Sequence, residues 1–252
     1  MPIPTITNGH PIYRQRDPAT TVASALSVLV THAASATVNT VASETNQTGS
    51  TVIKHHLYTV LISDIEISRL AQEGMITPYI GTLIREAEGR KLISYGPSSY
   101  GYDLRLSPKA FYVFKHVPGT VMNPKAFNPS NLEQVELHHD QWGSYFILPA
   151  HSYGLGVAME RLRLPDDITA LFIGKSTYAR MGVIANLTPG EAGWRGHLTL
   201  EFSNSAGADC RIYANEGIVQ ALFFRGETCS TTYRDRNGKY QDQPEDVVTA
   251  RA

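Results

Sequence analysis

Residues 174–204 read GKSTYARMGVIANLTPGEAGWRGHLTLEFSN. This stretch holds two short apolar runs, Val183–Leu187 and His197–Ser203, separated by a segment rich in glycine. Runs of about four to eight aliphatic and aromatic residues between turn-forming residues are typical of β-strands. Side chains alternate between the two faces of a strand, so His197, Thr199 and Glu201 are predicted to share one face.

The same pattern of short apolar runs continues on both sides of this stretch. Further strands are predicted at Tyr102–Leu106, Phe111–Phe114, Tyr145–Leu148, Tyr153–Glu160, Ile168–Ile173, Cys210–Ala214 and Ile218–Phe224. Many short strands separated by turns predict a mainly β fold, as a sandwich, jelly roll or distorted barrel.

Two short helices are expected before the strands. The spacing of Ser63 and Glu66 is that of a capping box, and Gly74 has the character of a residue that follows a helix. A second helix is expected over Pro78–Glu88, where apolar residues recur at helical spacing.

Residues 1–60 form an N-terminal extension of a different composition, poor in charge and rich in Thr, Ala, Ser and Val. Two interpretations stay open: a weakly ordered extension, or an accessory strand or helix that covers part of the main domain at 61–252. The uncharged stretch 18–43 has few large aliphatic residues, so neither a transmembrane helix nor a secretory signal is expected.

Composition limits the classes of partner. The 252 residues carry 22 Lys and Arg against 23 Asp and Glu, a net charge of −1. This balance argues against a broad nucleic-acid or membrane footprint. The two cysteines, Cys210 and Cys229, cannot form a disulfide framework, so a cytoplasmic location is expected.

Two familiar motifs are excluded. Gly174-Lys175-Ser176-Thr177 lacks the glycine that a nucleoside-triphosphate P-loop needs at position 169, which is Thr169. None of the nine histidines begins an H-x-E triplet and no P-C-x-x-C follows, so zinc deaminase ligands are missing. The pair His138-His139 is interpreted as two loop residues near the surface.

The stretch 174–204 also places several ionisable side chains within an apolar β region, and Glu201 is the clearest of them. Burying such groups costs free energy unless they are paired or face a ligand. Glu201 is therefore either a catalytic carboxylate or an edge-strand glutamate that faces water or pairs with Arg180.

Five stretches together resemble the dCTP deaminase family of the dUTPase-like superfamily. They are SSYGYDLRL (98–106), GKSTYARMG (174–182), LTPGEAGWRGHLTLEFSN (187–204), YANEGIVQALFF (213–224) and YRDRNGKYQDQ (233–243). The resemblance covers about residues 61–243. It implies a dUTPase-like distorted jelly-roll or barrel fold and a homotrimer with active sites built between subunits.

The resemblance also implies a reaction: zinc-free hydrolysis of dCTP to dUTP and ammonia, with Mg²⁺ on the triphosphate, which supplies dUTP and dUMP for thymidylate synthesis. Glu201 would be the general base and acid, while Ser176 and Arg180 would position water and base. Substrate contacts carry over to Lys175, Ser176, Thr177, Tyr178, Ala179, Arg180, Thr199, Leu200, Glu201, Gln220, Tyr233, Lys239 and Gln243. The partners implied are dCTP, dUTP and dTTP, the last as an inhibitor, and residues 233–243 would form a lid.

Three alternatives stay open. A dUTPase is disfavoured because its glycine-rich C-terminal motif is absent. A bifunctional enzyme would release dUMP, and Glu191 stands nearest the position where an aspartate of the superfamily activates water for attack on phosphate. A glutamate is one methylene longer than that aspartate, so its carboxylate would be out of place for activating the water that attacks phosphate. This favours dUTP over dUMP as the product. The third alternative is a nucleotide-binding homologue without turnover.

Overall fold

The computed structural model describes residues 41–45, 51–55, 60–185 and 188–251. The chain divides into two compact units, Met1–Leu57 and Tyr58–Ala252. The smaller unit contains an antiparallel hairpin of β1 (Val41–Thr45) and β2 (Thr51–His55). The interpretation of residues 1–60 as an extension falls mostly outside the described residues, which within that range are 41–45, 51–55 and 60.

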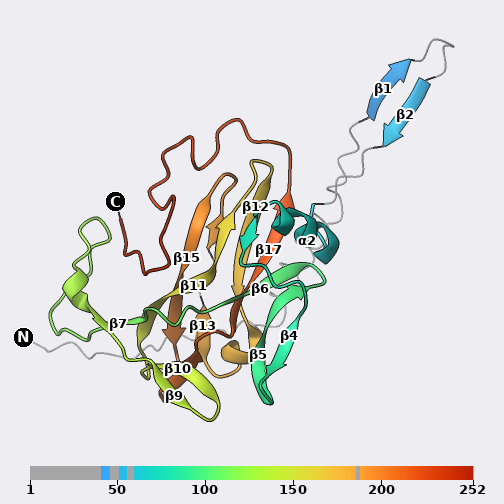
Figure 1. Ribbon diagram of the computed structural model, residues 1–252. Coiled ribbons are helices and arrows are strands. Elements are labelled where there is room, and N and C mark those ends of the chain that lie inside the picture. Colours follow the sequence, from blue (N-terminus) through green and yellow to red (C-terminus); the bar gives the residue numbers. More distant parts are fainter. Residues whose placement is uncertain (1–40, 46–50, 56–59, 186–187, 252) are drawn as a thin grey trace, which may run out of the picture. The chain divides into compact units, whose positions relative to one another are not determined.

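The larger unit is built from three sheets, two of them six-stranded (Figure 1). The first has the order β13-β15-β11-β7-β8, with β3 also paired to β11. Its strands are β3 (Ile76–Thr77), β7 (Tyr112–Phe114), β8 (Leu132–Gln134), β11 (Tyr153–Arg163), β13 (Val183–Ala185) and β15 (Arg195–Asn204).

The second six-stranded sheet has the order β14-β12-β17-β6-β5-β4. Its strands are β4 (Ile84–Ala87), β5 (Arg90–Ser98), β6 (Gly101–Arg105), β12 (Ile168–Gly174), β14 (Pro189–Gly190) and β17 (Gly217–Arg225). The three-stranded sheet, in the order β16-β10-β9, contains β9 (His138–Asp140), β10 (Gly143–Leu148) and β16 (Cys210–Tyr213).

One hydrophobic core joins the sheets. Phe202 of β15, Phe223 of β17, Phe172 of β12 and Phe146 of β10 all belong to a single cluster of buried side chains. Inward residues alternate with more exposed ones along much of β15, and its polar residues Thr199 and Glu201 face a surface cavity.

The mainly β fold is confirmed, and each predicted strand has a counterpart, most with ends shifted by one to three residues. The strand predicted at Val183–Leu187 ends at Ala185 in the described residues. Strands β1, β2, β3, β4, β5, β8, β9 and β14 were not predicted, because most are short or strongly polar.

The first predicted helix is present as α2 (Asp64–Gln72) with Ser63 as its N-cap. The capping box is wrong, however, because the Ser63 side chain makes no cap hydrogen bond. Glu66 instead accepts from Arg69 (2.8 Å) and Arg225 (2.6 Å). The Arg69 hydrogen bond is the main cause that lowers the pKa of Glu66 to about 2.

The second predicted helix is wrong: its C-terminal half, Ile84–Ala87, is strand β4, which pairs with β5 in a hairpin. The turn falls at Glu88 and Gly89, both of which have positive φ (53° and 72°). An X-Gly turn of this kind favours a hairpin over a continued helix, and the apolar spacing that suggested a helix is met by a strand and the loop before it.

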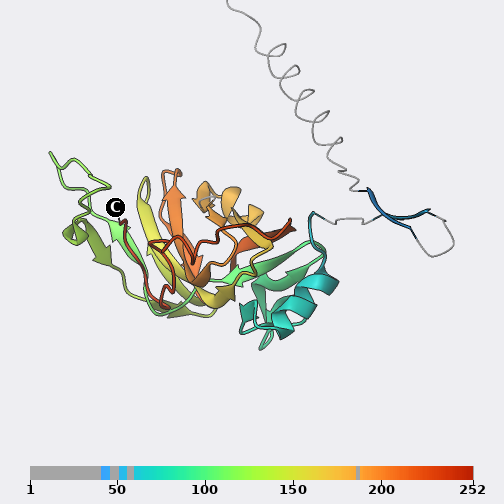
Figure 2. The same ribbon diagram turned by 90° about the horizontal axis from the view of Figure 1, so that it is seen from above.

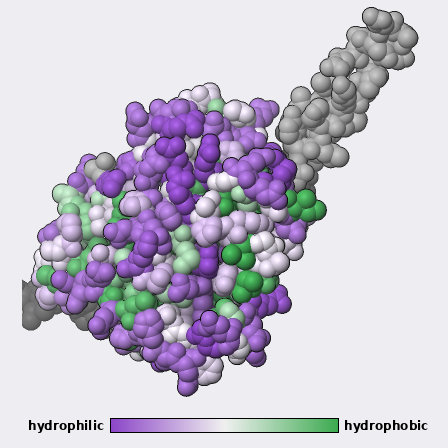
Figure 3. Space-filling model, viewed as in Figure 1, coloured by the Kyte–Doolittle hydropathy of each residue, from purple (hydrophilic) through white to green (hydrophobic). Residues whose placement is uncertain are grey.

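Figures 1 and 2 show the segment after β17, in red, running beside β15, and an isolated bridge joins Gly196 to Gln243. Hydrophilic residues cover most of the face seen in Figure 3. Across the described residues, no helix has the length and apolar character needed to cross a bilayer.

Candidate active site

A pocket of about 530 Å³ opens on β15 between the strands and the C-terminal segment. Six residues that the sequence analysis singled out line it: Glu191, Thr199, Glu201, Tyr233, Lys239 and Gln243. Its volume lies within the range of about 300–1,000 Å³ typical of small-molecule sites. Two carboxylates line it, of which Glu191 is paired with Arg236, and the walls are mostly apolar and aromatic, which suits a ligand with a flat ring.

Glu201 lines the candidate site from strand β15. Its backbone lies opposite Leu155 in the β11–β15 ladder, and its side chain is half-buried in the pocket. Burial raises the pKa of the Glu201 carboxyl above its usual value. Its carboxylate makes no hydrogen bond or ion pair to another described residue, so the alternative in which Glu201 pairs with Arg180 does not hold within this chain.

Thr199 links β15 to the C-terminal segment. Its hydroxyl donates to Gln243 Oε1 (2.8 Å) and accepts from the Val248 amide (3.1 Å). The segment approaches closely because Gly196 has no side chain: a Cβ there would lie 2.6 Å from the Gln243 nitrogen. Gly196 also has a φ of +141°, which favours glycine.

The segment 233–243 packs against the pocket through specific contacts. Trp194 Nε1 donates to the Tyr240 carbonyl (2.8 Å), and the Tyr240 amide donates to the Tyr233 hydroxyl (3.0 Å). Trp194 and Gln243 are buried, and Tyr233 packs against the core. These contacts seat the segment as one wall of the pocket; its role as a lid stays a prediction.

The other predicted catalytic residues lie on α3 (Ser176–Ala179) and at its end. Ser176, Thr177, Ala179 and Arg180 are exposed, and none of them lines the Glu201 pocket. Tyr178 is buried and its hydroxyl accepts the Tyr213 amide (2.9 Å), so this side chain anchors the helix. Leu200 points away from the pocket into the core.

Lys175 precedes α3 and its ammonium group points into the protein. It forms an ion pair with Asp103, which is 4% exposed, and donates to Ser94 Oγ (3.2 Å). Gln220 Nε2 donates to the same aspartate (3.2 Å) and to Ser98 (3.0 Å). These hydrogen bonds satisfy the half-buried side-chain amide of Gln220, and the ion pair of Lys175 with Asp103 holds the start of α3 in place.

Gly101 is the first residue of strand β6, directly after the two-residue turn Ser99-Tyr100 that joins β5 to β6. A Cβ at Gly101 would lie 2.8 Å from the Ala221 carbonyl, so the glycine permits close strand packing.

Glu191, the candidate second base, is paired with Arg236 of the C-terminal segment in a salt bridge. Both side chains are about half exposed. This ion pair links the loop before β15 to residues 233–243. It also engages the Glu191 carboxylate, which in the bifunctional reaction would have to activate the water that attacks phosphate.

The histidine pair lies on strand β9, not in a loop. His138 stacks on Tyr145 with ring centroids 5.5 Å apart, and His139 is hydrogen-bonded to Ser144 (2.8 Å). In the part of the chain that the structure describes, no three His, Cys, Asp or Glu side chains converge as metal ligands would.

Several wall residues were not predicted. Phe114, Phe127, Tyr153 and Leu155 come from β11, β7 and the loop after β7. Val248 and Ala250 come from beyond residue 243, where the sequence holds no motif. Only the pairing of β11 with β15 brings Leu155 to the pocket, and strand partners cannot be read from one sequence.

The chain is similar to known proteins over most of its larger unit. Residues 61–226 match the family model described as dCTP deaminase-like. The dCTP deaminases of Dechloromonas aromatica (strain RCB) and Acidovorax sp. (strain JS42) are 47% and 48% identical to it over 183 residues, 72% of this chain and 94% of each relative.

Among solved structures, the 2'-deoxycytidine 5'-triphosphate deaminase from Agrobacterium tumefaciens is 16% identical, with a TM-score of 0.46. The match covers 66% of this chain and 48% of that one.

Proposed function

This chain belongs to the dCTP deaminase family, and we propose that it hydrolyses dCTP to dUTP and ammonia without zinc, supplying dUTP for thymidylate synthesis. The observation that carries the proposal is Glu201, a half-buried carboxylate with a raised pKa in a ring-sized pocket. Its family relatives bear the name dCTP deaminase, which supports the substrate.

The proposed step needs one group that moves two protons. Glu201 takes a proton from water as the oxygen attacks C4 of cytosine, and passes that proton to N3 of the ring. As the C4–N bond of the tetrahedral intermediate breaks, Glu201 takes the proton of the C4 hydroxyl and gives it to the amine, so that C4 becomes the carbonyl of uracil and ammonia leaves. A carboxyl whose pKa is raised towards neutrality suits both roles, and such help contributes about 10²–10⁴-fold.

We further propose that Ser176 and Arg180 reach this reaction from a neighbouring subunit of a homotrimer. Both residues are exposed, and neither lines the Glu201 pocket of its own chain. A cyclic, head-to-tail interface brings one patch of each subunit to a different patch of the next. Arg180 would then orient Glu201, and Ser176 would hold the water.

The triphosphate would lie between α3 of the neighbouring subunit and the segment 233–243 that borders the Glu201 pocket. Thr177 and Lys239 offer a hydroxyl and an ammonium group to phosphate oxygens, and Tyr233 and Gln243 border the pocket. Mg²⁺ would enter with the nucleotide as part of the substrate. Lys175 would reach phosphate only by leaving Asp103, so we assign it first to holding α3.

Product analysis of dCTP turnover tests the proposal. We expect ammonia and dUTP in equal amounts, with little dUMP, because Arg236 engages the Glu191 carboxylate. Chromatography of the nucleotides separates the outcomes. Appearance of dUMP as fast as ammonia would establish the bifunctional reaction, and binding of dCTP without ammonia release would establish a homologue without turnover.

The pH dependence of kcat/KM reports on Glu201. The carboxylate must be ionised to accept the water proton, so activity falls as pH drops through its pKa. Because burial raises the pKa of Glu201, we expect the acid limb to lie above the ordinary glutamate value. An acid limb at or below that ordinary value would contradict its role as the base.

Asp103→Asn tests the anchoring of α3. Asparagine leaves the Lys175 ammonium group without its counter-charge, which for a buried pair costs about 3–5 kcal/mol. We expect a lower Tm and at least about a tenfold fall in kcat, because a displaced Ser176 loses its geometry. The double variant Asp103→Asn/Lys175→Gln should recover Tm, and wild-type kcat in Asp103→Asn would contradict the positioning role.

A further inference from the structure

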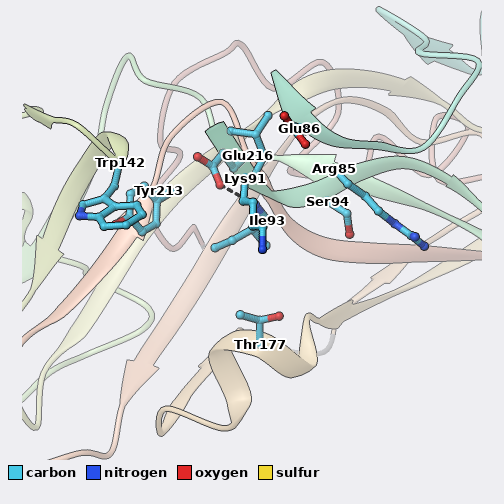
Figure 4. Close-up of a pocket in the computed structure, with 10 residues that line it drawn as sticks. Arg85, Glu86, Lys91, Ile93, Ser94, Trp142, Thr177, Tyr213 and Glu216 are labelled. Atoms are coloured by element: carbon cyan, nitrogen blue, oxygen red, sulfur yellow. Dashed lines mark hydrogen bonds between the residues drawn. The ribbon is translucent and has the colours of Figure 1, made fainter. Parts of the chain in front are cut away.

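A second cavity, of about 610 Å³, shares no lining residue with the Glu201 pocket. It is bordered by the β4–β5 hairpin, the turn before β10, the start of α3 and the residues before β17 (Figure 4). The side chains that matter here are Arg85, Lys91, Ser94, Trp142, Thr177 and Glu216. Apart from Thr177, none of its lining residues has a role in the proposed reaction.

One end of the cavity is aromatic. Trp142 is 60% exposed, and Figure 4 shows its ring beside that of Tyr213. The Trp142 amide donates to Asp140 Oδ1 (2.8 Å), and Asp140 is in turn held by Arg211 (2.6 Å). An exposed indole on an anchored turn offers a face on which a flat heterocycle can stack.

The centre of the cavity holds a buried acceptor. Glu216 is 5% exposed, and its Oε2 accepts the Ile93 amide (2.7 Å), as the dashed line in Figure 4 marks. Its Oε1 makes no hydrogen bond to a described residue, yet Glu216 lines the cavity. A ring N–H or amino group is the donor that such an oxygen accepts.

Two cationic side chains line the rest of the cavity, Arg85 at the end away from Trp142 and Lys91 nearer the centre (Figure 4). Within the described ranges, neither side chain has an acidic partner. The hydroxyls of Ser94 and Thr177 also face the cavity. Glu86 lies on the same hairpin and opposite Lys91 in its register, so it limits the local positive charge. Arginine, lysine and hydroxyl groups together recognise phosphate.

We propose that this cavity binds a nucleoside phosphate, with its base against Trp142 and Glu216 and its phosphates at Arg85 and Lys91. The cavity volume suits such a ligand. Thr177 adjoins Ser176, so a nucleotide bound here contacts the segment that the proposed reaction requires. The inference concerns binding alone and stands whether or not the chain deaminates dCTP.

Tryptophan fluorescence separates the two cavities, because the chain has two tryptophans and each cavity contains one. The probe is ATP, whose base is not cytosine. We expect ATP to quench the wild-type protein and to lose most of this signal in Trp142→Phe, where Trp194 alone reports. Undiminished quenching in Trp142→Phe would place ATP in the Glu201 pocket and overturn the proposal.

Calorimetry with charge variants tests the phosphate end. Arg85→Ala/Lys91→Ala should weaken ATP binding by at least about tenfold, whereas Lys115→Ala/Lys125→Ala, which removes two exposed lysines elsewhere, should not. Adenosine and inorganic triphosphate should each bind at least about tenfold more weakly than ATP. Equal binding of inorganic triphosphate and ATP, or no effect of the first variant, would contradict a nucleoside phosphate site.

Discussion

Glu201→Gln is expected to abolish ammonia release from dCTP, with a loss of at least about 10²–10⁴-fold in kcat. Glutamine keeps the shape of the side chain but cannot take a proton from water. Since the pocket walls are unchanged, binding of dCTP should stay within about tenfold of wild type.

Stability provides the control for this variant. A carboxyl group whose pKa is higher in the folded than in the unfolded protein stabilises the fold only while it is protonated, and this stabilisation is lost as pH rises above the unfolded-state pKa. The pKa of Glu201 is raised in this way, so replacing it with a neutral glutamine should not lower Tm at pH 7. Glu133→Gln, at an exposed position of β8, is the matched substitution and should leave turnover unchanged. Retention of more than a tenth of wild-type kcat in Glu201→Gln would remove Glu201 from the reaction.

Arg180→Ala is expected to reduce kcat by a similarly large factor, about 10²-fold or more, although Arg180 lies outside the Glu201 pocket of its own chain. The physical reason is the proposed subunit interface, where the guanidinium group orients the neighbour's carboxylate. The residue is exposed and has no side-chain partner in the described residues, so Tm should not change. Arg163→Ala, another exposed arginine without an ion pair there, is the control, and equal kinetics for the two variants would contradict the role of Arg180.

The strands that carry the candidate site could be predicted because their sequence pattern is strong. Alternation alone put Thr199 and Glu201 on one face of β15, and both line the pocket. The Pro78–Glu88 helix failed because apolar spacing over eleven residues fits a helix and a loop with a strand equally well; the turn at Glu88-Gly89 decided the outcome.

Other parts of the site depend on contacts between distant segments, which local pattern does not contain. Lys175 was predicted to contact the substrate, but its ammonium group pairs with Asp103, a residue 72 positions away. Val248 and Ala250 reach the pocket only because the C-terminal segment docks on Gly196. The separation of Arg180 from Glu201 is likewise a property of the folded chain.

Mixed trimers of Glu201→Gln and Arg180→Ala subunits test the central claim most directly. Each variant alone should be inactive, but the first supplies an intact Arg180 and the second an intact Glu201. If every site takes the two residues from adjacent subunits, random mixing in equal amounts leaves about a quarter of sites complete. The two chains would carry different affinity tags, be unfolded and refolded together, and be assayed for ammonia from dCTP. Recovery of about a quarter of wild-type activity is the predicted result, and activity no higher than that of either variant alone, in trimers that carry both tags, would contradict it.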